Sequence, residues 1–370
     1  MKTGSVRIEI RDNNGVLKTY VDNIVTAASW EWNRIGGCGV ANITIRDSYD
    51  AVSSAFGEDY EARIYLPDSN NIPILWYSGY IDRISPRVEG GQESVGISLL
   101  GYVNYIKRAI VKDKNYYGME LSLIAKDIID TYVVPVSAIT STAADYSDIN
   151  FTADDLYFNE SAYACLAKLA AISGKVEWGV RADKSFFFKL RNDGITRYFH
   201  IKENFSSFSP MRDYGQIITG IYLEGGEGYK AKFQVTNKVS TREEIVNNSS
   251  IITQSVGQQF ARSYLKEKGA INRSYSGTIP NFTGQVEGTI PIGKAAINMR
   301  IGITDKYDSG ILYNSGKKYD GGTESFQIER VVYTLKDYGI AAQLSFGSVA
   351  QNISDELGRL EYLINARGNQ

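Results

Sequence analysis

The chain has 370 residues, of which 43% are hydrophobic and 22% charged, so it is long enough for two or three globular domains and is not a disordered polymer. Its formal net charge of -2 at pH 7 excludes a strong field that would attract nucleic acid or an acidic membrane. The N-terminus carries no apolar signal segment and no run of about 18 apolar residues follows. We therefore expect synthesis in the cytoplasm and no membrane insertion by the chain itself.

Residues 1–110 alternate apolar and polar positions in short runs, which is the pattern of half-buried strands. The clearest case is a hairpin of residues 80–84 and 95–99 around the turn Gly90-Gly91. Gly79 and Gly101 lie beside these runs, and we expect them to form bends that curl a small sheet. Six or seven short strands at this spacing predict a first β-barrel over residues 1–110.

The character of the chain changes in residues 111–205, which we predict to be an inserted α/β domain. Four apolar residues recur at helical spacing, followed by a proline: Leu121, Ile124, Ile128 and Tyr132, then Pro135. A polar loop over 137–155 and a second helix from about Glu160 come next. Residues 176–180 and 186–190 then alternate as a hairpin.

Strand patterns resume after this insertion, so we predict a second, similar β-barrel over residues 206–350, with a helical insertion near 251–269. Residues 351–370 carry one narrow apolar stripe, which predicts a C-terminal helix that contacts a neighbouring subunit or its own barrel; the stripe is Ile353, Leu357, Leu360 and Ile364. The predicted fold class is therefore mainly β with α+β insertions: two small similar β-barrels, an inserted α/β domain and a C-terminal helix.

A short repeat lies between two of the later strands. Tyrosines recur every six residues, each followed by Asn or Asp and by glycine, at Tyr307, Tyr313 and Tyr319. Two interpretations fit. The repeat is a tight loop or protruding hairpin that needs Asn, Asp and Gly for its turns, or it is a tyrosine-rich contact surface, because tyrosine gives large contact area at low entropy cost.

Catalytic and metal-binding patterns are missing from the sequence. His200 is the only histidine and lies in an alternating run, where we interpret it as structural. The two cysteines, Cys38 and Cys165, have no metal spacing, and we interpret them as buried apolar residues. Residues 107–117 mix basic and aromatic side chains that fit a nucleic-acid backbone, but the segment is short. We predict no enzymatic activity, no cofactor and no metal.

Several of these segments together resemble the baseplate hub, or tail-tip hub, of tailed bacteriophages, the late-control D proteins and the hub part of type VI secretion spikes. The similarity covers nearly the whole chain but contains no catalytic signature. Its elements are the opening hairpin before Gly36-Gly37-Cys38-Gly39, the strand Trp76 to Tyr80, the hairpin GYIDRI…GYVNYIKRAIV, the helical insertion, Phe326-Gln327-Ile328-Glu329-Arg330-Val331, and the strand Ala341 to Gly347.

The resemblance implies a homotrimer in which six barrels form a pseudo-sixfold ring that joins a sixfold tail tube to a threefold tip. It implies a virion protein of the tail tip, assembled in the host cytoplasm, with a central channel for genome passage. The partners implied are distal tail ring and tail tube proteins, a tip or fibre protein, and tape-measure protein or DNA in the channel. A receptor- or carbohydrate-binding β module is the alternative, and a hydrolase with a carboxylate cleft is a weaker one.

Overall fold

The computed structural model describes most of the chain, and every structural statement below concerns these residues. They are 6–57, 59–67, 72–150, 152–173, 176–191, 194–213, 217–225, 228–235, 242–248, 254, 258, 261, 264, 265, 272–280, 294–298, 323–336 and 339–347. The predicted tyrosine repeat (Tyr307, Tyr313, Tyr319) and the predicted C-terminal helix (Ile353, Leu357, Leu360, Ile364) lie outside the described residues.

The first β unit is an array of antiparallel strands with a short helix, α1 (Tyr49–Val52). Its strands are β1 (Arg7–Arg11), β2 (Leu17–Tyr20), β3 (Val25–Asn33), β4 (Gly36–Ile45), β5 (Glu61–Pro67), β6 (Pro73–Glu89) and β7 (Gln92–Leu100). The long β6–β7 hairpin predicted from the sequence is present. Gly90 and Gly91 have φ of +58° and +78°, and this double left-handed turn matches the twist of the strands it joins.

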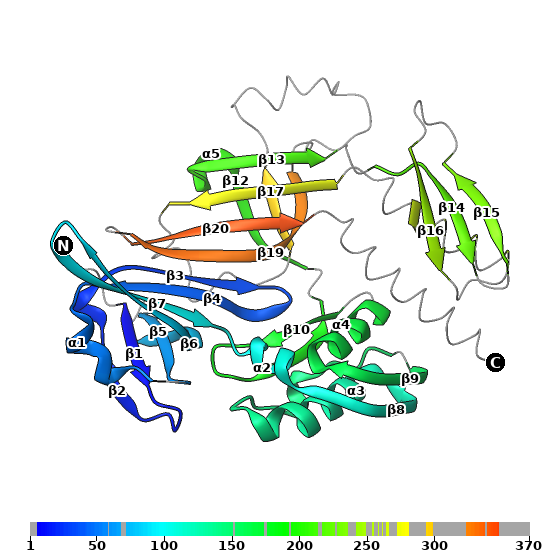
Figure 1. Cartoon of the computed structure of the whole chain (residues 1–370). Coiled ribbons are helices and arrows are strands. Elements are labelled where there is room, and N and C mark those ends of the chain that lie inside the picture. The colour runs from blue at the N-terminus through cyan, green and yellow to red at the C-terminus, as the bar shows by residue number, and fades with distance from the viewer. Residues whose placement is uncertain are drawn as a thin grey trace.

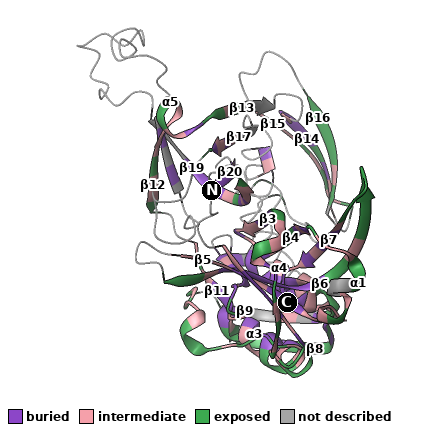
Figure 2. Ribbon diagram, turned by 90° about the vertical axis from the view of Figure 1, so that its left-hand side faces the viewer, coloured by how far each residue is buried: buried purple, intermediate pink, exposed green. Residues whose placement is uncertain are grey.

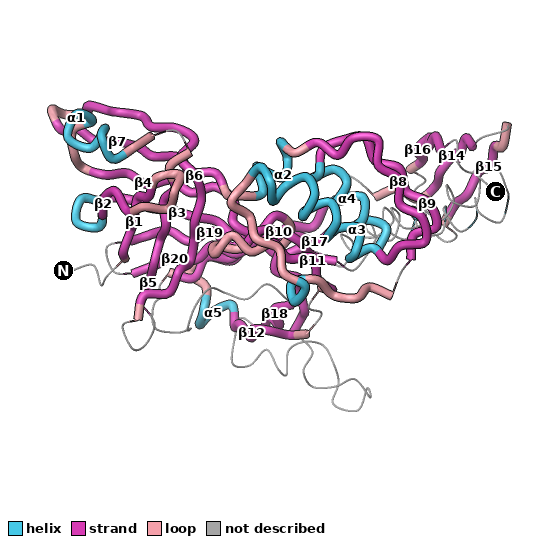
Figure 3. Tube along the Cα trace, turned by 90° about the horizontal axis from the view of Figure 1, so that it is seen from below, coloured by secondary structure: helices cyan, strands magenta, loops and turns pink. Residues whose placement is uncertain are grey.

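The inserted α/β unit packs three helices against a two-stranded antiparallel sheet (Figure 3). Its elements are α2 (Val103–Arg108), β8 (Ile110–Glu120), α3 (Leu121–Ile128) with a π-helical turn (Ile129–Val133), β9 (Thr152–Ser161), α4 (Ala162–Ser173), β10 (Val176–Val180) and β11 (Phe186–Leu190). Glu120 begins α3 because its carboxylate accepts the backbone N–H groups of Ser122 and Leu123. The antiparallel pairing of β8 with β9 was not predicted; part of β9 lies in the segment expected to be a polar loop.

The second β unit has the same strand order as the first. Its elements are β12 (Ile195–His200), α5 (Ile201–Asn204), β13 (Ser207–Asp213), β17 (Asn272–Ile279), β18 (Lys294–Asn298), β19 (Thr323–Lys336) and β20 (Gly339–Gly347). In space the order is β1-β5-β6-β7-β4-β3 in the first unit and β12-β18-β19-β20-β17-β13 in the second. The strands also follow the same order along the chain. The units differ in that β1 pairs antiparallel with β5, whereas β12 pairs parallel with β18. They also differ in that β2, which pairs with β1, has no counterpart beside β12 among the described strands.

Two boundaries differ from those predicted. Strand β12 lies before residue 205, yet it pairs with β18 and so belongs to the second β unit. Strands β14 (Gly220–Gly225), β15 (Lys230–Gln234) and β16 (Glu243–Asn248) were expected in the second barrel but form a separate three-stranded sheet. Alternation of apolar residues shows that a segment is a strand but not which strands it pairs with, so both differences concern pairing. The five described residues between 254 and 265 are helical, in agreement with the predicted insertion.

The hairpins β6–β7 and β19–β20 repeat each other residue for residue. The pairs from Tyr80–Leu100 to Glu89–Gln92 have counterparts from Gln327–Gly347 to Lys336–Gly339. Both ladders shift register at the same place, so that an acidic residue, Asp82 or Glu329, bulges out of the pairing. The sequences there are Ile81-Asp82-Arg83-Ile84 and Ile328-Glu329-Arg330-Val331. The chain is thus mainly β, as predicted, and contains an internal structural repeat.

Candidate assembly interface

The two β units meet edge to edge, where β3 of the first pairs with β19 of the second (Figure 1). The antiparallel pairing places residues 330–334 opposite residues 33–29. The backbone N–H of Arg34 extends this ladder by donating to the carbonyl of Glu329 at 2.9 Å. We call this β3–β19 contact the seam, and it makes one continuous sheet from β13 to β2.

An aromatic cluster packs beneath the seam. The ring of Trp30 stacks on that of Tyr333 at 5.8 Å between centroids, and Trp76 meets Tyr333 edge-on at 5.1 Å. All three side chains are buried (Figure 2 shows where burial concentrates), and they belong to one hydrophobic core that draws on both β units. Aromatic contacts add about 0.5–1.5 kcal/mol each to the area they bury, so the two units are joined by a core as well as by hydrogen bonds.

Two ion pairs cross the seam next to the repeated bulge. The Arg34 guanidinium donates to Glu329 at 2.8 Å, and their side chains are 7% and 19% exposed. Arg330 donates to Glu31 at 2.8 Å, but its side chain is 51% exposed. Burial by itself raises the pKa of the Glu31 carboxyl, yet hydrogen bonds from the Val40 backbone and from Arg330 outweigh it, so the pKa lies below its usual value. The bulge residues of β19 therefore both bind β3.

We expect Arg34→Met to lower the free energy of unfolding by about 2–3 kcal/mol, because it leaves a largely buried carboxylate without its partner. Arg330→Met is the control on the same seam. We expect it to cost less than about 1 kcal/mol because Arg330 is half exposed and Glu31 keeps its hydrogen bonds from the Val40 N–H and from Asn33. Urea unfolding at pH 7 measures both. Equal losses for the two variants would contradict the assignment of the buried pair.

The inserted α/β unit docks on the first β unit through contacts between backbones that only glycine permits. Strand β10 runs parallel to the start of β4, with Gly179 opposite Gly36 and Val180 opposite Gly37. A Cβ atom built on Gly37 would lie 2.1 Å from the carbonyl oxygen of Val180, and one on Gly179 would lie 2.4 Å from the Gly36 carbonyl carbon. The glycine cluster at residues 36–39 is therefore a docking point.

Gly79 and Gly101 have a related role, which corrects the prediction that they form bends. A Cβ on Gly101 would lie 1.8 Å from the carbonyl oxygen of Cys38, and one on Gly79 would lie 2.7 Å from the carbonyl oxygen of Leu100. Strand β6 bulges at Trp76 against β5 and at Asp82 against β7 instead. These glycines thus permit close strand approach.

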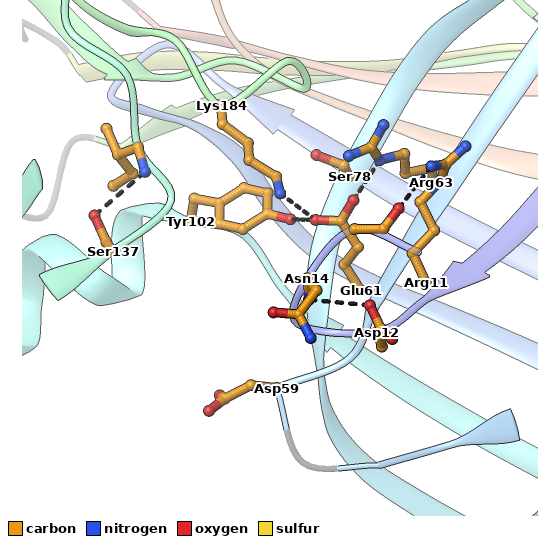
Figure 4. A network of polar contacts seen from close by, with 12 residues as sticks. Arg11, Asp12, Asn14, Asp59, Glu61, Arg63, Ser78, Tyr102, Ser137 and Lys184 are labelled. Carbon is orange, nitrogen blue, oxygen red and sulfur yellow. Dashed lines mark hydrogen bonds and ion pairs between the residues drawn. The ribbon is translucent and has the colours of Figure 1, made fainter. Parts of the chain in front are cut away.

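A buried carboxylate, Glu61, completes the docking contact (Figure 4). Its side chain on β5 is 5% exposed and receives Lys184 from the β10–β11 turn at 2.5 Å. The hydroxyl of Tyr102 and the guanidinium of Arg63 also donate to this carboxylate. Burial alone raises the pKa of Glu61, but the hydrogen bond and charge of Lys184, with the contacts of Tyr102 and Arg63, hold the pKa below its usual value. Burial and the negative charge of Glu61 raise the pKa of Tyr102, so it remains a hydroxyl donor.

The described residues contain no candidate metal site and no candidate membrane-spanning helix. Within the described ranges no group of three or more His, Cys, Asp or Glu side chains is placed to hold a metal ion. None of the helices in this part of the chain is long and apolar enough to cross a membrane. Cys38 and Cys165 are both buried, as predicted, and neither is in a disulfide. Burial raises the pKa of the Cys38 thiol to about 12. The arrangement is suited to holding structural units together.

Sequence reasoning missed the residues that join the units. Arg34 and Glu329 are 295 positions apart, and Lys184 and Glu61 also come from distant elements, so no local spacing links them. One signal was available: the Ile-acid-Arg sequence occurs at residues 81–83 and 328–330. Comparing those two segments with each other would have indicated the repeat and its bulge.

Comparison with known proteins bears on the fold. The sequence matches no protein-family model and no curated protein. The structure is similar to the 43 kDa tail protein of prophage MuSo2 from Shewanella oneidensis, with 13% identity, a TM-score of 0.64 and coverage of 94% of this chain and 98% of that one. A tail protein from Neisseria meningitidis MC58 gives 10% identity, a TM-score of 0.63 and coverage of 95% and 99%.

A chain of the Francisella PdpA–VgrG complex is similar over 93% of this chain and 52% of its own length, with 10% identity and a TM-score of 0.53. The structural neighbours are thus phage tail proteins and a complex that contains VgrG, the two groups to which the sequence pattern pointed. At these identities the likeness concerns the fold, and the chain has the fold of phage tail proteins.

Proposed function

We propose that the chain is a structural hub of the baseplate or tail tip of a tailed bacteriophage. Three copies form a pseudo-sixfold ring that joins a sixfold tail tube to a threefold tip and leaves a central channel for genome passage. The proposal includes no catalytic role. Its partners are the distal tail ring and tube proteins on one side and a tip or fibre protein on the other, with tape-measure protein or DNA in the channel.

The observation that carries this proposal is the identical strand order of the two β units. A threefold assembly of chains that each hold two similar units presents six similar units around its axis. Such a ring can therefore meet a sixfold partner on one face while keeping the threefold symmetry of a tip. The tail-protein fold of the structural neighbours supports the same location in the virion.

The test is the mass and shape of the purified full-length protein. We expect light scattering after size-exclusion chromatography to give three times the chain mass of 41.1 kDa. Averaged electron micrographs viewed down the axis should show a ring with six lobes and an open centre. A protein that stays monomeric at tens of micromolar, or a closed particle without a channel, would contradict the hub.

A further inference from the structure

The first β unit has a free edge at the place where the second unit carries the seam. Strand β6 pairs with β5 only from Pro73 to Tyr80, and with β7 from Tyr80 to Glu89. No described strand covers the other side of residues 81–89. The matching stretch of β19 pairs with β18 over residues 323–327 and then with β3 over residues 330–334. The edge of β19 that pairs with β3 thus corresponds to an edge of β6 that pairs with no described strand.

The second β unit has the complementary free strand, β13. It pairs with β17, and no described strand pairs with its other side. The strand registers make β13 the counterpart of β3. Across the first unit, Ser29 of β3 pairs with Asn42 of β4, which pairs with Ser98 of β7. Across the second unit, Ser209 of β13 pairs with Ser276 of β17, which pairs with Ser345 of β20, the counterpart of Ser98. Each chain therefore holds one completed seam between β3 and β19. It also holds the counterparts of these two strands, β13 and β6, whose matching edges pair with no described strand.

We propose that β13 of a second copy of the chain pairs antiparallel with the free edge of β6. The internal repeat sets the register: Ser209 stands opposite Arg87 and Asp213 opposite Arg83, as Ser29 stands opposite Thr334 and Asn33 opposite Arg330 within the chain. This inference rests on the proposed function, since it supplies the contact that a ring of chains requires. The occupant is a second copy because the complementary strand belongs to this chain.

The two free edges do not pair with each other within one chain. Between β13 and β6 the sheet contains β17, β20, β19, β3, β4 and β7. At about 4.8 Å per strand spacing, the two edges are separated by roughly 34 Å along the sheet. The contact is consequently head-to-tail, the kind that closes into a ring when the rotation permits.

The repeated bulge supports the proposed register. Arg83 is the counterpart of Arg330, which binds Glu31 in the internal seam. Arg83 and its neighbour Asp82 are both exposed in the single chain. The charged bulge of β19 is part of the seam, whereas the charged bulge of β6, at Asp82 and Arg83, faces no described strand.

Two prolines make this contact weaker than the internal seam. Pro86 is the counterpart of Tyr333, and Pro210 is the counterpart of Trp30. In the β6–β7 hairpin, the backbone N–H and C=O groups of Glu89 face β7, because Glu89 pairs with Gln92 beside the two-residue turn. Backbone groups of successive residues in a strand face alternate sides, so the nitrogen of Pro86, three residues earlier, faces the free edge. Proline has no N–H, and the facing prolines remove one pair of hydrogen bonds and separate the strands locally. The ring then dissociates at the contacts between chains, leaving each chain whole.

The test is a disulfide placed in the proposed register, Arg87→Cys with Ser209→Cys in the full chain. Both residues are exposed, and directly opposite residues in a sheet lie within disulfide range. The native cysteines are buried and form no background. The control, Arg83→Cys with Ser209→Cys, is displaced by four residues, roughly 13 Å. We expect mild oxidation of the first variant to give linked species up to three chains on non-reducing gels, and the control to remain single chains.

The possible results separate the two proposals. If the unmodified protein is a trimer but neither pair links, or both link equally, this register is wrong while the hub stands. If the unmodified protein is a monomer, the hub itself fails. As a second measurement, Pro86→Tyr with Pro210→Ala restores the missing donors, and we expect it to lower the dissociation concentration of the trimer at least tenfold. Precipitation with no gain in trimer would instead show that the prolines keep the edges unpaired, which overturns the inference.

Discussion

Gly37→Ala is expected to lower the free energy of unfolding by about 2–5 kcal/mol and to detach the inserted α/β unit from the first β unit. Gly37 has a φ of +75°, where any other residue costs about 1–2 kcal/mol. The new methyl group would also lie 2.1 Å from the backbone oxygen of Val180, and neither backbone can give way without separating β10 from β4. Such overpacking costs typically 1–3 kcal/mol more.

Gly15→Ala is the matched control for this change. Gly15 has nearly the same backbone conformation, with a φ of +78°, but no atom lies within 4 Å of a Cβ built there. We expect Gly15→Ala to lower the free energy of unfolding only by the cost of the left-handed backbone conformation, about 1–2 kcal/mol. Urea unfolding measures the losses, and hydrogen exchange of the β10 amides reports the docking. Similar losses for the two variants would show that close approach at Gly37 does not matter.

The second large effect is expected at the buried Glu61 carboxylate. Lys184→Met removes one of its partners, and breaking a buried pair costs about 3–5 kcal/mol. Because Arg63 and Tyr102 still donate to the carboxylate, we expect about 2–3 kcal/mol here. The control is Lys126→Met in the pair Lys126–Asp130, whose side chains are 32% and 42% exposed, and it should cost less than about 1 kcal/mol.

This second effect should depend on pH in a defined direction. The pKa of Glu61 is lower in the folded chain than its unfolded value of about 4.3. Its stabilising contribution is therefore complete above pH 4.3 and is lost as the pH falls through the folded pKa. The difference between wild type and Lys184→Met should be largest near neutral pH and shrink below about pH 4. A difference that grows on acidification would mean that Lys184 does not act through the carboxylate.

Local patterns were sufficient for the elements whose side chains face one core. Alternation around Gly90-Gly91 predicted the β6–β7 hairpin, and the spacing of Leu121, Ile124 and Ile128 predicted α3. The β8 strand was missed because its pattern is broken by Asp113 and Gly118, which have φ of +48° and +54°. The periodicity of apolar residues alone thus predicted the mainly-β fold class and two of the three helices of the inserted unit, α3 and α4.

Contacts between units were beyond this kind of reasoning because they depend on pairing over long sequence distances. Nothing around Glu61 indicates Lys184 as its partner, and the seam joins β3 to β19 across most of the chain. Glycines presented a different problem: Gly79 and Gly101 were recognised as special positions, but a glycine needed for a bend and one needed for close strand approach look the same in a sequence. Only the geometry distinguishes the two.

The seam also determines when the protein can finish folding during its synthesis. Arg34 and Glu329 are 295 residues apart, and ribosomes add about 5–20 residues each second. The open edge of β3 therefore waits roughly 15–60 s for its partner, and an unpaired strand edge is a template for association with other chains. Contacts of such long range also slow folding. Nascent chains of this protein should accordingly depend on chaperones until β19 has emerged, and premature termination before residue 323 should yield aggregates of an otherwise complete N-terminal unit.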